Sequence, residues 1–119
     1  MRLRFISPTM HGIIDYAAAL ALIVGPLFFG LGHSSPMAIW LSVSTGVLVV
    51  LISLNTQYAF SLFKIISFDG HLAIDLIAAT VFLIAPFLLN FSGMDFYYYI
   101  ANASVVYLVV ALSDNSKSI

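Results

Sequence analysis

Two short polar pairs carry the side chains of this sequence that are best suited to chemistry. Histidine precedes aspartate by four residues at His11–Asp15, and the same spacing recurs at His71–Asp75. On an α-helix, residues four apart lie on one face with their Cβ atoms about 6 Å apart, so each imidazole stacks with its carboxylate. Imidazoles and carboxylates arranged in this way can form ion pairs, bind a metal ion or relay protons.

Both pairs belong to an internal repeat that covers most of the chain. A shift of sixty residues, without a gap, aligns His11 with His71 and Asp15 with Asp75. A duplicated unit predicts pseudo-two-fold symmetry, in which the second pair repeats the role of the first. We therefore expect a single domain over residues 1–119, with repeats at about 4–55 and 64–115. The same shift aligns Ile6-Ser7 with Ile66-Ser67, Ala18-Ala19 with Ala78-Ala79, Pro26 with Pro86, Ser44 with Ser104, Leu48-Val49-Val50 with Leu108-Val109-Val110, Ser53 with Ser113 and Asn55 with Asn115.

The composition indicates a protein that lies in a lipid bilayer. Of the 119 residues, 62% are hydrophobic and 8% are charged, whereas soluble domains have about 25% charged residues. So few charged side chains cannot cover a water-exposed surface. The formal net charge of −1 gives no indication of nucleic-acid binding. The absence of cysteine excludes disulfides, thiolate metal sites and thiol catalysis.

Four apolar segments, at about 8–31, 36–55, 68–91 and 95–113, predict an all-α membrane protein with four transmembrane helices. Each segment is close to the roughly 20 residues that cross about 30 Å of hydrocarbon, and a helix satisfies its own backbone groups in lipid. Ser7-Pro8 and Ser67 are typical helix starts. Short turns follow the first and third segments, so each repeat is predicted to be a helical hairpin. The residues that indicate these turns are Gly30, Gly32, Ser34, Ser35 and Pro36, and then Asn90, Ser92 and Gly93.

The basic residues predict the orientation in the membrane. Arg2, Arg4, Lys64 and Lys117 lie in the N-terminal, middle and C-terminal segments, and neither hairpin turn contains Lys or Arg. The positive-inside rule then puts both termini in the cytoplasm, in a multi-pass protein of the inner membrane. The two hairpins would run in the same direction, with their pseudo-two-fold axis along the membrane normal, unlike the inverted repeats of many transporters.

Three further features carry structural expectations. Pro26 and Pro86 remove a backbone hydrogen bond and free the carbonyls of Leu22 and Phe82, so a kink is expected at each. Small residues at Ala38, Ser42 and Gly46 predict close helix packing, either within the chain or across a dimer. The segment 57–65 is expected either to extend the second helix or, preferably, to form a short amphipathic piece at the headgroups. His33 is interpreted as a solvated residue of the first turn.

The phrases around the two prolines resemble a known family. Gly25-Pro26-Leu27-Phe28-Phe29-Gly30-Leu31 and Ala85-Pro86-Phe87-Leu88-Leu89-Asn90-Phe91 are similar to the Ser-Pro-Trp phrase, with its apolar run, of the SPW-repeat family of small bacterial membrane proteins. Here glycine or alanine replaces the serine, and leucine or phenylalanine replaces the tryptophan. The His-Gly-x-x-Asp-Tyr phrase at 11–16 also looks like one that some relatives carry before the repeat. The resemblance implies a multi-helix integral membrane protein and no particular activity.

Three interpretations of the His/Asp cluster remain open from the sequence. In the first and preferred one, His11, Asp15, His71 and Asp75 pair within a helix or crosswise, and the chain is a non-enzymatic scaffold or accessory membrane subunit. In the second, the four side chains hold a divalent metal ion, or haem iron binds between the two histidines. In the third, the cluster relays protons or ions. Acid–base catalysis at the cluster is the one enzymatic alternative. The expected partners are the lipid bilayer and either further copies of the chain or a larger membrane complex, without nucleic acid.

Overall fold

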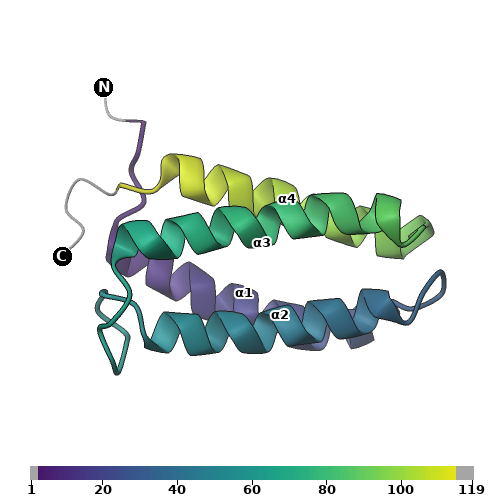
Figure 1. Ribbon diagram of the computed structural model, residues 1–119, viewed down its shortest axis with the longest axis horizontal. Helices are drawn as coiled ribbons and strands as arrows, with labels where there is room; N and C mark the ends of the chain where they lie inside the picture. The colour runs from purple at the N-terminus through teal and green to yellow at the C-terminus, as the bar shows by residue number, and fades with distance from the viewer. Residues whose placement is uncertain (1–2, 115–119) are drawn as a thin grey trace.

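The computed structural model describes residues 3–114 and contains four long helices (Figure 1). They are α1 (Pro8–Phe28), α2 (Met37–Leu54), α3 (Phe68–Leu88) and α4 (Gly93–Leu112), and each is long and apolar enough to span a membrane. Within the described part of the chain, β structure is limited to two isolated bridges. The all-α prediction is therefore confirmed. The first and third predicted segments run three residues too far, because Gly30 (φ 63°) and Asn90 (φ 56°) adopt left-handed backbone conformations that end the helices.

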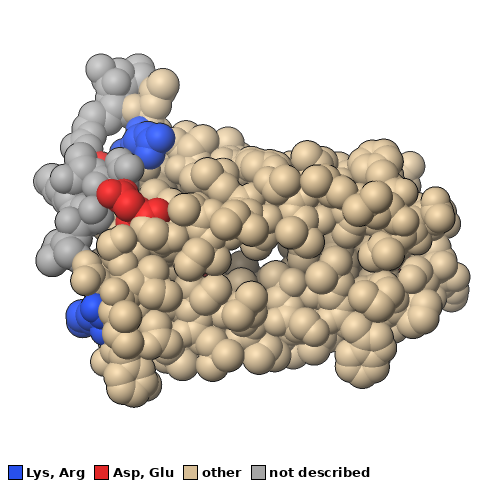
Figure 2. Space-filling model, in the orientation of Figure 1, with Lys and Arg blue, Asp and Glu red and all other residues tan. Residues whose placement is uncertain are grey.

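The helices form two hairpins that run in the same direction. α1 packs on α2 and α3 packs on α4, and both hairpin turns lie at one end of the molecule (Figure 1). The described ends of the chain and the loop between the hairpins lie together at the opposite end. Figure 2 shows that the charged side chains visible on this face gather at that same end. The predicted parallel arrangement about a pseudo-two-fold axis is thus present, although Arg2, Lys117 and Asn115 lie outside the described residues.

Equivalent local signals begin both hairpins. The Ser7 side chain accepts a hydrogen bond from the backbone N–H of Met10 at 3.2 Å, and Ser67 accepts one from Gly70 at 3.0 Å. These serine caps satisfy backbone donors that would otherwise have no partner in the first turn of a helix. The caps fix where α1 and α3 begin, and they place each histidine four residues after its cap.

Pro26 lies inside α1, and the carbonyl that it frees finds a partner in α2. The Ser42 hydroxyl donates to the Leu22 carbonyl oxygen at 2.8 Å and lies 2.7 Å from the Tyr98 hydroxyl. Because the single Ser42 proton goes to the carbonyl, Tyr98 donates to Ser42. The helix interruption is therefore stabilised by side chains from both hairpins, as is usual for proline in membrane helices.

The small-residue stripe of α2 packs within the chain. Ala38 and Ser42 are fully buried, and Gly46 is buried against α1. A Cβ atom added to Gly46 would lie 2.9 Å from the Ala19 carbonyl oxygen and 2.8 Å from an Ile23 side-chain carbon. The sequence left open whether this stripe serves a dimer; the contacts place it within the chain, where Gly46 packs on α1 and Ser42 also contacts Tyr98 of α4.

The loop between the hairpins overturns one of the two expectations for residues 57–65, the extension of the second helix. It neither extends α2, which ends at Leu54, nor forms a helix of its own. Its backbone folds back so that Thr56 pairs with Ile66 in an isolated bridge, and the Lys64 ammonium donates to the Tyr58 carbonyl at 2.6 Å. The predicted extension of α2 is wrong because these contacts join residues across a turn, which a periodic pattern does not record. The location of the loop at the headgroups stays a prediction. The loop brings Tyr58 into the protein interior, where 6% of it is exposed.

Candidate functional site

Four side chains converge between α1 and α3, one to two turns inside the end that holds the termini. We call His11, Asp15, His71 and Asp75 the tetrad. His11 Nε2 lies 2.9 Å from Asp75 Oδ2 and 3.2 Å from Asp15 Oδ1. His71 Nε2 lies 2.9 Å from Asp15 Oδ2 and 3.4 Å from Asp75 Oδ1. Each histidine therefore faces both carboxylates, and the shorter contact of each crosses the pseudo-two-fold axis.

The tetrad lies in an apolar environment. His11 is 0% exposed and His71 1% exposed, and their rings meet edge to face with centroids 5.3 Å apart. The ring of Phe68, fully buried, stands 5.2 Å from that of His11, and Tyr58 packs against His71 at 5.6 Å. Buried charges in such surroundings are costly unless they are paired, so the four groups depend on one another.

A hydroxyl group from the end of a second helix contacts the outer nitrogen of each imidazole. His11 Nδ1 lies 2.8 Å from Ser113 Oγ, and His71 Nδ1 lies 2.7 Å from Thr56 Oγ1. Each hydroxyl also lies close to the carbonyl oxygen four residues earlier, at 2.6 Å for Ser113 and 2.8 Å for Thr56. A carbonyl can only accept, so the one hydroxyl proton goes to it. Both imidazoles must therefore donate through Nδ1–H.

These hydrogen bonds at Nδ1 determine the protonation state of Nε2 in each neutral imidazole. With Nδ1 protonated, a neutral imidazole presents a bare lone pair at Nε2. That lone pair would point at two carboxylates, which is repulsive unless a proton or another cation lies between them. His11 Nε2 makes a hydrogen bond of good geometry to Asp75. His71 Nε2 is buried and makes none to any described residue, although Asp15 Oδ2 is 2.9 Å away.

Tyr58 adds a fifth polar group to the cluster. Its hydroxyl donates to Asp15 Oδ2 at 3.0 Å. Burial, together with the nearby Asp15 carboxylate, raises the pKa of the Tyr58 hydroxyl far above its usual value, so it remains a donor. No tyrosine among residues 3–114 donates to Asp75 in the same way, so the two carboxylates differ in their hydrogen-bond partners.

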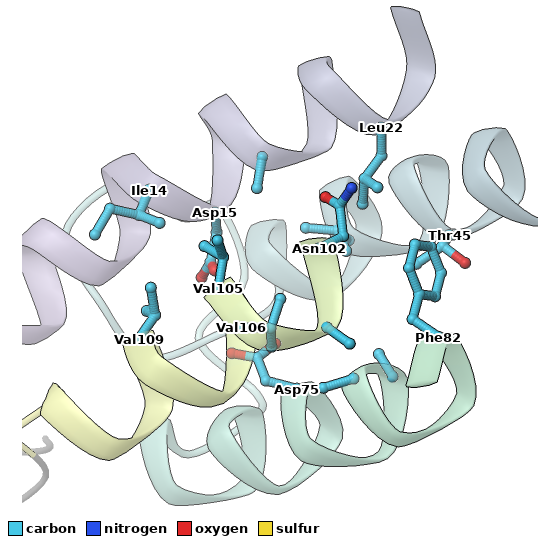
Figure 3. Close-up of a pocket in the computed structure, with 15 residues that line it drawn as sticks. Ile14, Asp15, Leu22, Thr45, Asp75, Phe82, Asn102, Val105, Val106 and Val109 are labelled. Atoms are coloured by element: carbon cyan, nitrogen blue, oxygen red, sulfur yellow. The ribbon is translucent and has the colours of Figure 1, made fainter. Parts of the chain in front are cut away.

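A cavity of about 100 Å³ lies next to the tetrad, between the two hairpins (Figure 3). Asp15 and Asp75 border it at one end, and Leu22, Thr45 and Phe82 lie toward the other end. Most of its wall is aliphatic, with Asn102 as a further polar side chain. The cavity reaches both carboxylates from the membrane-spanning part of the molecule.

Asp95 forms a second polar connection, at the opposite end of the helices. Its Oδ1 accepts from the Gly32 backbone at 2.8 Å, and its Oδ2 accepts from the Ser34 backbone at 3.0 Å and the Ser34 hydroxyl at 2.5 Å. Asp95, at the start of α4, therefore holds the turn of the first hairpin. His33, in that turn, is exposed as predicted and lies far from the tetrad along the chain.

Several supporting residues were missed by sequence reasoning. The repeat aligns Ser113 with Ser53, yet the hydroxyl that supports His71 belongs to Thr56, three residues later. Tyr58 lies in the segment 57–65, whose path the sequence did not predict, and Asp95 has Ser35 as its repeat equivalent. Ser113, which contacts His11, is the supporting residue for which a signal in the sequence existed, because the repeat aligns it with another serine, Ser53.

A family model described as the SPW repeat domain matches residues 9–114. The chain belongs to the SPW repeat family. Comparisons with curated proteins and with solved structures each found no match.

The SPW repeat match covers the tetrad, both of its hydroxyl partners and both helix prolines. The prolines, which belong to the phrase that resembles the family name, lie at the end of the helices opposite the tetrad. Pro26 follows Asp15 by eleven residues, which corresponds to about 16 Å along a helix. In this SPW repeat protein, the proline phrase contributes to packing near the hairpin turns, and the tetrad forms a separate polar centre.

Proposed function

We propose that this chain is a small non-enzymatic scaffold or accessory subunit of the membrane, and that the tetrad joins its two hairpins. The observation that carries the proposal is the pair of 2.9 Å contacts across the axis, His11–Asp75 and His71–Asp15. Backbone contacts are concentrated within each hairpin, and a buried core that includes Leu22, Phe82 and Tyr99 joins the hairpins toward their turns. The tetrad adds a charged contact between the hairpins at the opposite end.

The hydroxyl partners support the same role. Ser113, at the end of the second hairpin, contacts His11 of the first, and Thr56, after the first hairpin, contacts His71 of the second. Each imidazole thus contacts the opposite repeat through both of its nitrogens, with a hydrogen bond at Nε2 in His11 and a 2.9 Å contact at Nε2 in His71. Polar contacts between membrane helices contribute about 0.6–2 kcal/mol each, so a reciprocal set of this kind is enough to select one arrangement of the hairpins.

The proposal is tested by making each carboxylate neutral. Asp15→Asn and Asp75→Asn keep the side-chain shape and remove the charge that faces the imidazoles. Each is expected to lower the free energy of unfolding in detergent by about 1–3 kcal/mol. Thermal unfolding followed by circular dichroism measures the effect, with the exposed Asp69→Asn as the matched control. Wild-type stability in both tetrad variants would contradict the proposed joining role.

We further propose that the protein lies in the inner membrane with both termini in the cytoplasm. Arg4 and Lys64, the described basic residues, lie at the end of the helices opposite the two hairpin turns, which agrees with the positive-inside rule. A reporter that is active only outside the cytoplasm, fused after Ile119, is expected to stay inactive. A fusion within the turn at His33 should be active, and the reverse pattern would overturn the orientation.

The proposed partners are lipid and other membrane subunits, either further copies of this chain or a larger complex. Lipid contact is supported by the large apolar side chains that cover the outer faces of the helices, such as Leu20, Leu27, Ile77 and Leu108. The tetrad residues themselves face inward, so they support the internal structure and are not offered to a partner.

A further inference from the structure

We propose that the tetrad is a binding site for one divalent transition-metal ion of the zinc class, held by His11 Nε2, His71 Nε2 and one oxygen each from Asp15 and Asp75. One ligand atom from each of the four side chains lies within 4.8 Å of the others. The proposal rests on the joining role above, since the ion would replace direct imidazole–carboxylate contacts with shared coordination.

The distances fit tetrahedral coordination. Zinc binds imidazole nitrogen and carboxylate oxygen at about 2.0–2.2 Å, and a tetrahedron of that size separates its corners by about 3.4 Å. The four nitrogen–oxygen distances of the tetrad lie between 2.9 and 3.4 Å. These distances involve both oxygens of each carboxylate. One ligand atom from each side chain lies within 4.8 Å of the others, so the separations need to change by at most about 1.4 Å to reach the spacing of a zinc tetrahedron.

The hydrogen bonds at Nδ1 prepare both imidazoles for this role. Metal-binding histidines ordinarily donate their other ring N–H to an oxygen, which fixes the tautomer and leaves the second nitrogen free for the metal. Ser113 and Thr56 provide that oxygen here, at 2.8 and 2.7 Å. The Tyr58 hydroxyl orients the Asp15 carboxylate in the same way. The ligands and their supporting groups thus have the pattern of a metal centre.

His71 Nε2 gives the second, independent observation. The His71 residue is 1% exposed. Its Nε2 atom points into the tetrad and has no hydrogen bond of good geometry to a described residue. A metal ion at the centre would take its lone pair directly. Charge is balanced as well, since two carboxylates and two neutral imidazoles around a divalent cation sum to zero. In the apolar interior such neutrality greatly lowers the cost of burial.

The ligand set also selects among ions. Two imidazole nitrogens favour zinc and its first-row neighbours, whereas Ca²⁺ and Mg²⁺ require six or more mainly oxygen ligands. The cavity of about 100 Å³ borders both carboxylates, so the side chains have adjacent space in which to adjust around an ion. The carboxylate-lined end of that cavity is visible in Figure 3.

The test uses the full chain, purified in detergent through a tag without histidine and loaded with Zn²⁺ or Co²⁺. We expect one Zn²⁺ per chain after dialysis, a higher unfolding temperature with Zn²⁺, and intense visible bands typical of four-coordinate Co²⁺. The double variant Asp15→Asn/Asp75→Asn should lose all three signals. Zn²⁺ bound equally by the double variant, no Zn²⁺ in the folded wild type, or a weak six-coordinate Co²⁺ spectrum would each overturn the proposal.

A second variant retains all four ligands, in case the double variant does not fold. Thr56→Val removes the oxygen that accepts from His71 Nδ1, and loss of such a supporting group weakens metal binding by about 10–100-fold. Ser104→Ala removes an exposed hydroxyl with the same backbone contact and serves as the control. Equal affinity in Thr56→Val and Ser104→Ala would contradict the site. If the wild type binds no Zn²⁺ but Asp15→Asn still lowers its stability, the metal site is contradicted and the joining role is supported.

Discussion

Replacing His71 with alanine is expected to lower the free energy of unfolding by about 3–5 kcal/mol, as for other broken buried ion pairs. The substitution leaves the Asp15 and Asp75 carboxylates facing a single imidazole in an apolar interior. It also leaves the Thr56 hydroxyl without its partner at Nδ1. Denaturation in detergent, followed by circular dichroism, measures the loss.

The pseudo-two-fold axis predicts that His11→Ala has a closely similar effect, because His11 makes the equivalent contacts to both carboxylates and to Ser113. His33→Ala is the matched control, since the side chain is exposed in the first hairpin turn. It should change stability by no more than about 0.5 kcal/mol. A large loss from one tetrad histidine and none from the other would contradict the symmetric description.

Replacing Asp95 with alanine is expected to lower the free energy of unfolding by about 2–3 kcal/mol, since hydrogen bonds to charged groups are among the stronger ones. The variant leaves two backbone N–H groups, at Gly32 and Ser34, without the carboxylate that accepts from them. Thermal unfolding of Asp95→Ala beside the exposed Asp69→Ala checks this prediction. Equal stability of the two variants would show that the turn of the first hairpin does not depend on α4.

Much of the fold follows from local signals in the sequence. The length and apolar character of the segments predict four helices, and Ser7 and Ser67 predict where two of them begin. The four-residue spacing of His11 and Asp15, together with the sixty-residue repeat, predicts that two such pairs meet across an axis. These inferences succeed because helix periodicity and symmetry relate residues without reference to loops.

The supporting groups could not be predicted in the same way. Thr56 and Tyr58 reach the tetrad through a loop whose path depends on long-range backbone contacts, such as the bridge from Thr56 to Ile66. Thr56 also departs from the repeat register by three residues relative to Ser113. Asp95 has no acidic equivalent in the first repeat, so symmetry gave no indication of its role. Each of these residues acts where the two halves of the chain differ.

The most direct measurement of the central claim, that the tetrad joins the two hairpins, is a double-mutant cycle between His71 and Asp15. These residues belong to different hairpins and lie 2.9 Å apart at Nε2 and Oδ2. For His71→Ala and Asp15→Asn, we expect a coupling free energy of about 0.5–3 kcal/mol, as for other residues in direct contact. The control cycle pairs His71→Ala with Asp95→Ala, at opposite ends of the helices, and should be additive within about 0.5 kcal/mol. Additivity of His71 and Asp15 as well would contradict the claim.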